Sequence, residues 1–176
     1  MGPEEPDDAL LCPTIEPHVA AAVLGAISAY ALLEYQVDEL IWELAAVEPE
    51  IGACITAQFF SIAPKMDALI SLAHAQYVSD AHIKRLDKLK TSIGGLGNRR
   101  HRLAHDPWFY AYETAKTYRL EKTAKGGLIH AYKPVTEEEI KHFKDEIKAV
   151  ETTFRGLRSE ILDVFRSQPY RPPRMP

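Results

Sequence analysis

The sequence predicts an all-α fold: an antiparallel helical bundle of four to five helices with a β-hairpin inserted at about residues 109–133. Three observations support this prediction. Apolar residues recur every three or four positions through most of the chain, which is the spacing of one helical face. Proline and glycine residues divide this pattern into helix-sized segments. Only between Phe109 and Lys133 do the side chains alternate as they do in paired strands.

Length and composition predict one globular domain with two disordered ends. A sequence of 176 residues with 46% hydrophobic and 26% charged residues is typical of a single domain. We expect an acidic disordered leader at residues 1–13, a helical domain at 14–167 and a disordered Pro/Arg-rich tail at 168–176. The acidic start has no features of a secretory signal, and the longest nearly apolar stretch, residues 19–33, is shorter than the roughly 20 residues that span a bilayer. We therefore expect a cytoplasmic protein with no membrane contact.

Helical patterns account for the first half of the domain. Apolar positions step by three and four through residues 17–47 and predict a long first helix. Pro49 suits the first turn of a second helix. Pro64 predicts a kink or a short connector before the helical pattern resumes at residues 66–77.

The next helix is expected to end in the segment that is richest in arginine and histidine. Ser79 is a suitable N-cap for this helix. Three glycines within residues 94–97 predict that the helix kinks or restarts there. Pro107 predicts its end near His105, because the residue before a proline avoids helical geometry.

The remaining elements are the hairpin and a final helix. The hairpin is expected to turn at Lys125–Gly127. Thr136 and Glu139 have the spacing of a capping box, which marks a helix start. The helix that follows has an apolar seam with steps of three and four residues, as in helices packed lengthwise. The seam consists of Ile140, Phe143, Ile147, Val150, Phe154, Leu157, Ile161 and Val164.

Charge is unevenly distributed along the chain. The net charge is −4, yet residues 1–64 contain eleven acidic side chains and no Lys or Arg. Between Lys84 and His105 there are seven Lys or Arg residues against one Asp. Such a patch attracts polyanions, although a solvated helix face that pairs with the acidic half gives the same pattern. The side chains expected to contact nucleic acid are Lys84, Arg85, Lys88, Arg99 and Arg102.

The segment Asn98–Trp108 concentrates the side chains that suit catalysis. Histidine titrates near neutrality and can move protons, whereas arginine stays cationic and holds phosphate oxygens with a planar fork. On RNA, His105 can take the proton of a 2′-hydroxyl or give one to the leaving oxygen, while Arg100 stabilises charge on the phosphate oxygens. These two residues therefore predict cleavage of RNA phosphodiesters without a metal.

The hexapeptide Arg-His-Arg-Leu-Ala-His at positions 100–105 resembles the motif of the HEPN superfamily, in which Arg, a polar residue and three further positions precede His. The resemblance extends to Asp-Pro-Trp at positions 106–108 and, more loosely, to the order of long helices over residues 17–166. It implies a small helical domain of a bacterial defence or toxin–antitoxin system, with Arg100 and His105 as catalytic residues of a metal-independent ribonuclease. It also implies a homodimer whose two motifs face each other, and an antitoxin or another protein as a further partner.

Helix geometry limits how this site can be built. Five positions on a helix correspond to about 140° of rotation, so Arg100 and His105 do not share a face and need either long arginine reach or a second subunit. His101 and His105 do share a face, with the spacing of a two-histidine metal pair. Adjacent arginines would repel a divalent cation, and the cysteines at positions 12 and 54 match no metal spacing. We therefore expect no metal and no cofactor.

A non-catalytic interpretation of the same segment stays open. Leu103, Ala104 and Trp108 can pack the helix end into the core, with Arg100 paired to an acid of the first helix and His105 bonded to a backbone carbonyl. The aromatic side chains of residues 108–112 can stack on bases or pack within the hairpin. On this interpretation the chain is a helical dimerisation or interaction module.

Overall fold

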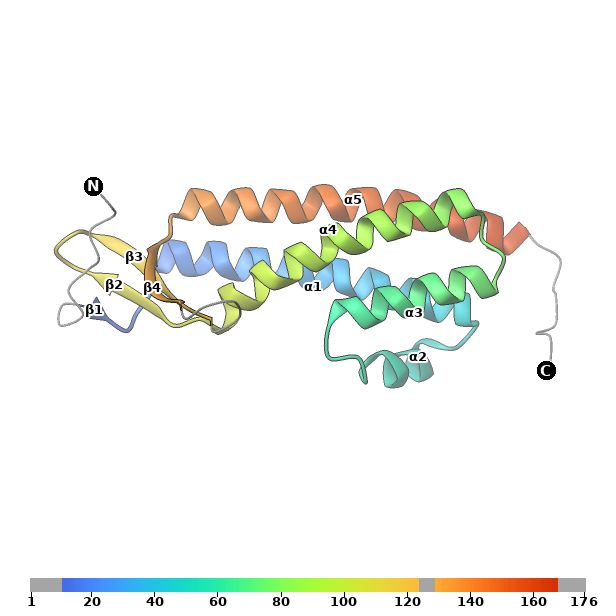
Figure 1. Ribbon diagram of the computed structural model, residues 1–176, viewed down its shortest axis with the longest axis horizontal. Helices are drawn as coiled ribbons and strands as arrows, with labels where there is room; N and C mark the ends of the chain where they lie inside the picture. The colour runs from blue at the N-terminus through green and yellow to red at the C-terminus, as the bar shows by residue number, and fades with distance from the viewer. Residues whose placement is uncertain (1–10, 124–128, 168–176) are drawn as a thin grey trace. The chain divides into compact units, whose positions relative to one another are not determined.

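The structure is a computed structural model that describes residues 11–123 and 129–167 (Figure 1). Within these residues the chain is mostly helical, as predicted, with a small antiparallel sheet that makes all-α an approximate description. The elements in chain order are β1 (Leu11–Cys12), α1 (Pro17–Ala45), α2 (Pro49–Thr56), α3 (Ile62–Ala75), α4 (Asp80–His105), β2 (Trp108–Ala111), β3 (Lys116–Thr123), β4 (Ile129–Pro134) and α5 (Glu137–Ser167).

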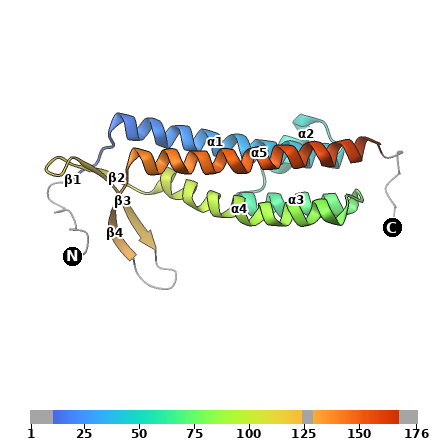
Figure 2. The same cartoon turned by 90° about the horizontal axis from the view of Figure 1, so that it is seen from above.

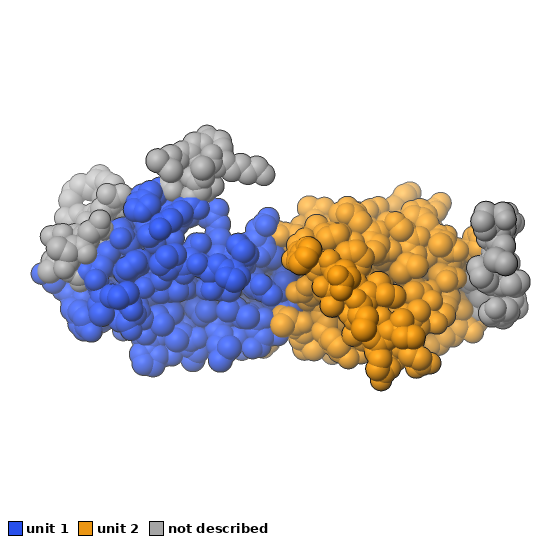
Figure 3. Space-filling view, turned by 90° about the horizontal axis from the view of Figure 1, so that it is seen from below, with its two compact units in different colours: residues 1–30, 96–147 blue, residues 31–95, 148–176 orange. Residues whose placement is uncertain are grey.

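The chain forms two compact units (Figure 3). Unit 1 comprises residues 1–30 and 96–147, and unit 2 comprises residues 31–95 and 148–176. Helices α1, α4 and α5 are each divided between the two units, with one segment in each. The first ten residues of the expected leader and the whole of the expected tail lie outside the described residues.

The sheet belongs to unit 1 and has the strand order β1-β2-β3-β4, with all neighbours antiparallel. The prediction of a single hairpin was therefore too simple, because β2–β3 and β3–β4 form two successive hairpins. Tyr112 to Ala115 make the first turn, where Ala115 adopts a positive φ of 50°. The sequence did not predict this turn, because the turn contains neither Gly nor Pro. The expected turn at Lys125–Gly127 lies outside the described residues.

Strand β1 corrects the expectation of a disordered leader up to residue 13. Leu11 pairs with Ala111, and Cys12 pairs with Tyr110. Two residues carry no recognisable strand pattern of their own, so their conformation is set by the backbone hydrogen bonds of β2.

In unit 1, the helical core consists of the first half of α1, the end of α4 and the start of α5 (Figure 2). Val19, Ala26, Leu103, Ile140 and Phe143 are buried there. The predicted capping box begins α5: the Thr136 N–H donates to Glu139 Oε2 (2.9 Å), and the Glu139 N–H donates to Thr136 Oγ1 (3.2 Å). These two bonds satisfy backbone donors that a helix start leaves open, so the start of α5 is defined locally.

In unit 2, α2 and α3 pack with the remaining parts of α1, α4 and α5. The predicted connector lies at residues 57–61, but α3 begins at Ile62, so Pro64 lies in the first turn of the helix and not before it as the sequence predicted. Gly52 is buried against the Trp42 ring, which leaves no room for a Cβ atom. The core contains the fully buried side chains Leu33, Leu40, Leu44, Met66, Leu69, Leu86, Ile93, Phe154, Leu157 and Ile161.

Helix α4 runs from Asp80 to His105 without interruption, so the predicted restart at the glycines was wrong. A glycine in a helix costs about 1 kcal/mol relative to alanine. Leu89, Ile93 and Leu96 lie on one face of this stretch and are buried. Burial of each such side chain contributes about 1.5–3 kcal/mol, which exceeds the cost of the glycines.

Helix α1 has 29 residues and is longer than the apolar stretch at residues 19–33. Among the described residues it is the one helix long and apolar enough to cross a membrane, by length and composition only. A core helix of a soluble protein passes the same test, and α1 buries Val23, Leu33, Leu40 and Leu44.

Candidate functional site

The candidate site is the last two turns of α4, residues 98–105, in unit 1. Leu103 is buried and anchors this segment, and the indole Nε1 of Trp108 donates a hydrogen bond to the Leu103 carbonyl (3.2 Å). The helix ends at His105, two residues before Pro107, as the sequence predicted. The helix end is therefore fixed by packing on one side, while its other sides present polar residues.

His101 and His105 lie together on the exposed face of this segment. Their ring centroids are 4.5 Å apart and the rings are tilted by 45°. Both residues are exposed. Among the described residues, no group of three or more His, Cys, Asp or Glu side chains is arranged to hold a metal ion. The arrangement is that of two accessible imidazoles on adjacent helical turns, which suits proton transfer to or from a bound molecule.

Arg100 points in another direction, towards α1. Its guanidinium carbon lies 5.5 Å from the centre of the Tyr30 ring, and the residue is half-buried. The five-residue separation from His105 places the two side chains on different faces of α4. The alternative in which Arg100 contacts the first helix agrees with this direction, because Tyr30 belongs to α1.

The two neighbouring arginines form ion pairs. Arg99 pairs with Glu146 of α5, and its guanidinium lies over the Phe143 ring at 4.2 Å. Arg102 pairs with Glu121 of β3. The side chain of Glu121 is only 8% exposed and also contacts Lys133 Nζ at 2.6 Å. Both of these predicted nucleic-acid contacts therefore have carboxylate partners within unit 1.

The other three predicted nucleic-acid contacts lie in unit 2. Lys84 and Lys88 are exposed on α4. Arg85 pairs with both carboxylate oxygens of Glu160, one at 3.0 Å, and His82 Nε2 lies 3.3 Å from the same carboxylate. The side chain of Arg85 is therefore held against α5, whereas the two lysines project into solvent.

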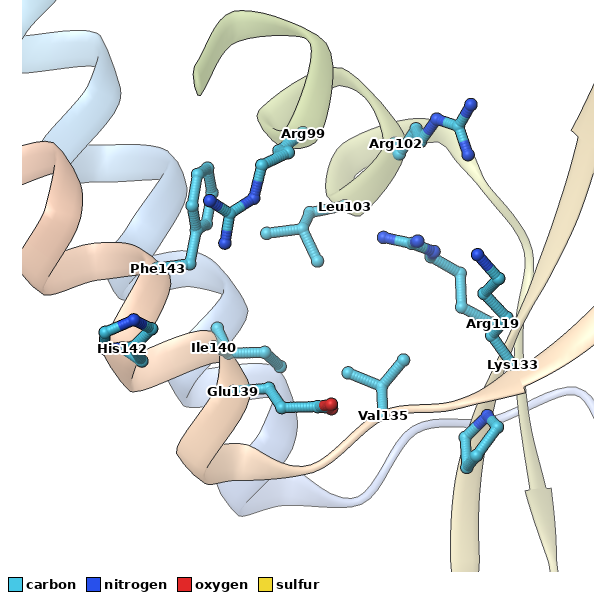
Figure 4. Close-up of a pocket in the computed structure, with 11 residues that line it drawn as sticks. Arg99, Arg102, Leu103, Arg119, Lys133, Val135, Glu139, Ile140, His142 and Phe143 are labelled. Carbon is cyan, nitrogen blue, oxygen red and sulfur yellow. The ribbon is translucent and has the colours of Figure 1, made fainter. Parts of the chain in front are cut away.

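A pocket of about 330 Å³ opens in unit 1 beside the Arg99–Arg102 face of α4 (Figure 4). Cationic side chains from α4, β3 and β4 border it, together with apolar side chains from α4, α5 and the residues that precede α5. The lining residues are Arg99, Arg102, Leu103, Arg119, Lys133, Pro134, Val135, Glu139, Ile140, His142 and Phe143.

Sequence reasoning missed Arg119 and Lys133. These residues are directly opposite each other in the β3–β4 register. Burial lowers the pKa of the Arg119 guanidinium; nearby Arg102 lowers it further, while Asp106 and Glu139 oppose the shift. Arg119 Nε lies 3.3 Å from Asp106 Oδ2, and the Arg119 side chain is 15% exposed. The available signal was the presence of cations within the predicted hairpin, at positions 116, 119, 122 and 133, but it does not show which of them border a pocket.

No protein-family model matches this chain, and neither a curated protein nor a solved structure is significantly similar to it.

Proposed function

We propose that this chain is an RNA-binding domain of the HEPN type that cleaves RNA as a homodimer without a metal. The observation that carries the proposal is the exposed pair of imidazoles, His101 and His105, on the last turns of α4. The hexapeptide at positions 100–105, with its resemblance to the HEPN motif, supports it. A role in bacterial defence or as a toxin with an antitoxin partner belongs to the same proposal.

The proposed reaction uses the 2′-hydroxyl of RNA as its nucleophile. His105 accepts the proton of this hydroxyl, or in the reverse role gives a proton to the leaving 5′-oxygen. The 2′-oxygen forms a bond to phosphorus and the bond to the 5′-oxygen breaks, which leaves a cyclic phosphate and a 5′-hydroxyl. Arg100 stabilises the charge that develops on the phosphate oxygens. DNA lacks the internal nucleophile, so the proposal predicts RNA as the substrate.

The homodimer supplies what one chain does not bring to a single face. Arg100 and His105 lie on different faces of α4. The proposed composite site therefore combines Arg100 of one copy with His105 of the other. Helix α1 exposes three large apolar side chains, Leu24 (65%), Leu32 (53%) and Tyr35 (50%). Leu32 and Tyr35, which belong to unit 2, are three positions apart and share one helical face that a second copy can cover.

Incubation of purified protein with total RNA in EDTA tests the proposal. We expect cleavage that is lost in Arg100→Ala and in His105→Ala. His74→Ala is the matched control, because His74 is an exposed histidine at the end of α3 and has no role in the proposal. Intact RNA with the unmodified protein would reject catalysis.

Sedimentation at micromolar protein tests the dimer separately. We expect a dimer that Leu32→Glu dissociates, because a charge on the shared apolar face loses its solvation in the interface. A species of about 20 kDa alone, with the unmodified chain, would remove the composite site.

A second candidate function is a non-catalytic interaction module, favoured by an exposed apolar surface in unit 2. Ile51 (56%) and Ile55 (47%) lie on one face of α2, and Phe60 in the connector after it is fully exposed. Exposed apolar groups of this size mark protein contact sites. The same experiments separate the candidates: intact RNA with retained dimerisation supports the module.

A further inference from the structure

The pocket in unit 1 has the composition of a site for an anion that carries an apolar body. In Figure 4 the Arg119 guanidinium extends from β3 toward Leu103, and the Lys133 ammonium lies beside it. The Arg99 guanidinium enters from α4, while Arg102 points away from the centre. We infer that this pocket binds the phosphoryl group of a nucleotide, with Arg119 and Lys133 as its principal donors.

The donor groups are held in position by carboxylates that do not line the pocket. Glu121 contacts Lys133 and Arg102, and Asp106 contacts Arg119. The single ion pair of Arg119 involves Nε, so within the described part of the chain its two terminal nitrogens remain available. A guanidinium with two parallel N–H donors matches the oxygens of a phosphate, and an ammonium adds a charge-assisted bond.

The pocket does not attract a phosphoryl group through an excess of positive charge. The four cations that border the pocket are balanced by Glu139 in the lining and by the carboxylates Glu121, Asp106 and Glu146 behind it. Glu139 Oε2 is engaged by the Thr136 N–H. Recognition therefore depends on the orientation of donors at short range, and salt is expected to weaken nucleotide binding only moderately.

The apolar side of the pocket is the surface that would contact the rest of the nucleotide, beyond its phosphoryl group. Leu103, Val135, Ile140 and Phe143 form a surface next to the cations. Ligand sites typically measure about 300–1,000 Å³ and combine an apolar lining with a few oriented polar groups. At about 330 Å³ the pocket is at the small end of this range, which suits one nucleotide rather than a dinucleotide cofactor.

This inference is independent of RNA cleavage. The pocket uses the helical face of residues 99, 102 and 103, whereas the imidazoles of His101 and His105 point away from that face. Loss of catalysis therefore leaves the inference intact, and absence of nucleotide binding leaves the proposed function intact.

Calorimetric titration of the full chain with AMP, adenosine and inorganic phosphate tests the inference. We expect AMP to bind more tightly than either fragment, because it alone uses both the donors and the apolar surface. Equal affinity for adenosine and AMP would overturn the phosphoryl assignment. Equal affinity for phosphate and AMP would overturn the nucleotide assignment.

Matched variants locate the binding. Lys133→Gln and Lys141→Gln each remove one ammonium. The two lysine side chains are matched in exposure, at 57% and 58%, and each contacts a glutamate. Only Lys133 of these two lines the pocket. We expect Lys133→Gln to weaken AMP binding about tenfold and Lys141→Gln to leave it unchanged, because a charge-assisted hydrogen bond contributes about one order of magnitude. Equal effects of the two variants would overturn the inference. Arg119→Gln should weaken AMP binding at least as much as Lys133→Gln. If Arg119→Gln does not fold, the comparison of Lys133→Gln with Lys141→Gln still tests the inference.

The phosphoryl group can belong to a free nucleotide or to the end of an RNA chain. Short RNAs with a 5′-phosphate or a 5′-hydroxyl distinguish these sources. Tighter binding of the phosphorylated RNA, lost in Lys133→Gln, would identify the chain end as the source. No AMP binding at millimolar concentration, together with equal affinity for the two RNAs, would reject the site.

Discussion

The end of α4 presents two faces that differ in almost every physical respect. One face carries His101 and His105, exposed and in ring contact. The other carries Arg99 and Arg102, each paired with a glutamate, beside a pocket and above the buried Leu103. One or two positions along the helix separate His101 from Arg102 and Arg99, because residues three or four apart share a helical face and closer neighbours do not.

The difference shows that a dense run of basic residues does not act as one surface. An ion pair at the surface, such as that of Arg99 with Glu146, contributes only about 0–1 kcal/mol to stability, but it orients the cation and neutralises its charge. Arg99 and Arg102 are therefore poor candidates for general attraction of RNA and good candidates for shaping a pocket. Lys84 and Lys88 in unit 2 are exposed and are better suited to the former role.

The largest expected effect concerns the histidine face. His105→Ala should lower the rate of RNA cleavage by roughly 10²- to 10⁴-fold, because a general acid or base contributes that much. RNA affinity and the thermal midpoint should change little, since the side chain is exposed. Single-turnover kinetics, a filter-binding assay and thermal unfolding measure the three quantities. A loss of several kcal/mol in stability together with lost binding would make His105 a structural residue.

The next effect concerns Arg100, which lies between the two faces. Arg100→Ala should slow cleavage by about 10²-fold, the usual cost of one donor to a developing oxyanion, and should also weaken RNA binding. Arg100→Lys should restore binding more fully than rate, because ammonium supplies the charge without the planar fork. Equal recovery of rate and binding would show that charge alone matters at this position.

A smaller effect tests whether the ion pairs of Glu121 stabilise the face of α4 that carries Arg99 and Arg102. Glu121→Gln should lower the free energy of unfolding by about 1–3 kcal/mol, because a buried acceptor for Arg102 and Lys133 loses its charge. Chemical denaturation measures this change. Glu113→Gln serves as the control, since Glu113 is an exposed residue in the β2–β3 turn. Equal stabilities of the two variants would mean that the ion pairs around Glu121 contribute nothing.

The smallest effect compares a paired cation, Arg99, with Lys88, which has no carboxylate partner among the described residues. Lys88→Gln should reduce the log–log salt slope of RNA binding by about 0.7, the value for one phosphate contact on a single strand. Arg99→Gln should leave the slope nearly unchanged, because Glu146 already neutralises the guanidinium. Titrations at several salt concentrations give both slopes. A larger change for Arg99 would reverse the assignment of the two cations.

Local patterns predicted much of this fold and the place of the candidate site. The first and last helices, the connector before Pro64, the capping box of α5 and the end of α4 at His105 all agree with the structure. Each depends on residues within a few positions of one another: a helical period, a cap or a proline. The helical spacing of Arg100 and His105 likewise followed from the sequence, because it needs only the geometry of one helix.

Contacts between distant segments decided what the sequence left open. Strand β1 exists because Leu11 and Cys12 pair with β2, and α4 continues through its glycines because flanking leucine and isoleucine side chains are buried. Arg102 meets Glu121, and Arg119 meets Lys133 across the sheet, only after the hairpins have formed. The sequence by itself determined where most of the helices lie and which residues are charged. Tertiary structure decided which charges are neutralised and which line a pocket, because an ion pair requires proximity in space and leaves no periodic pattern along the chain.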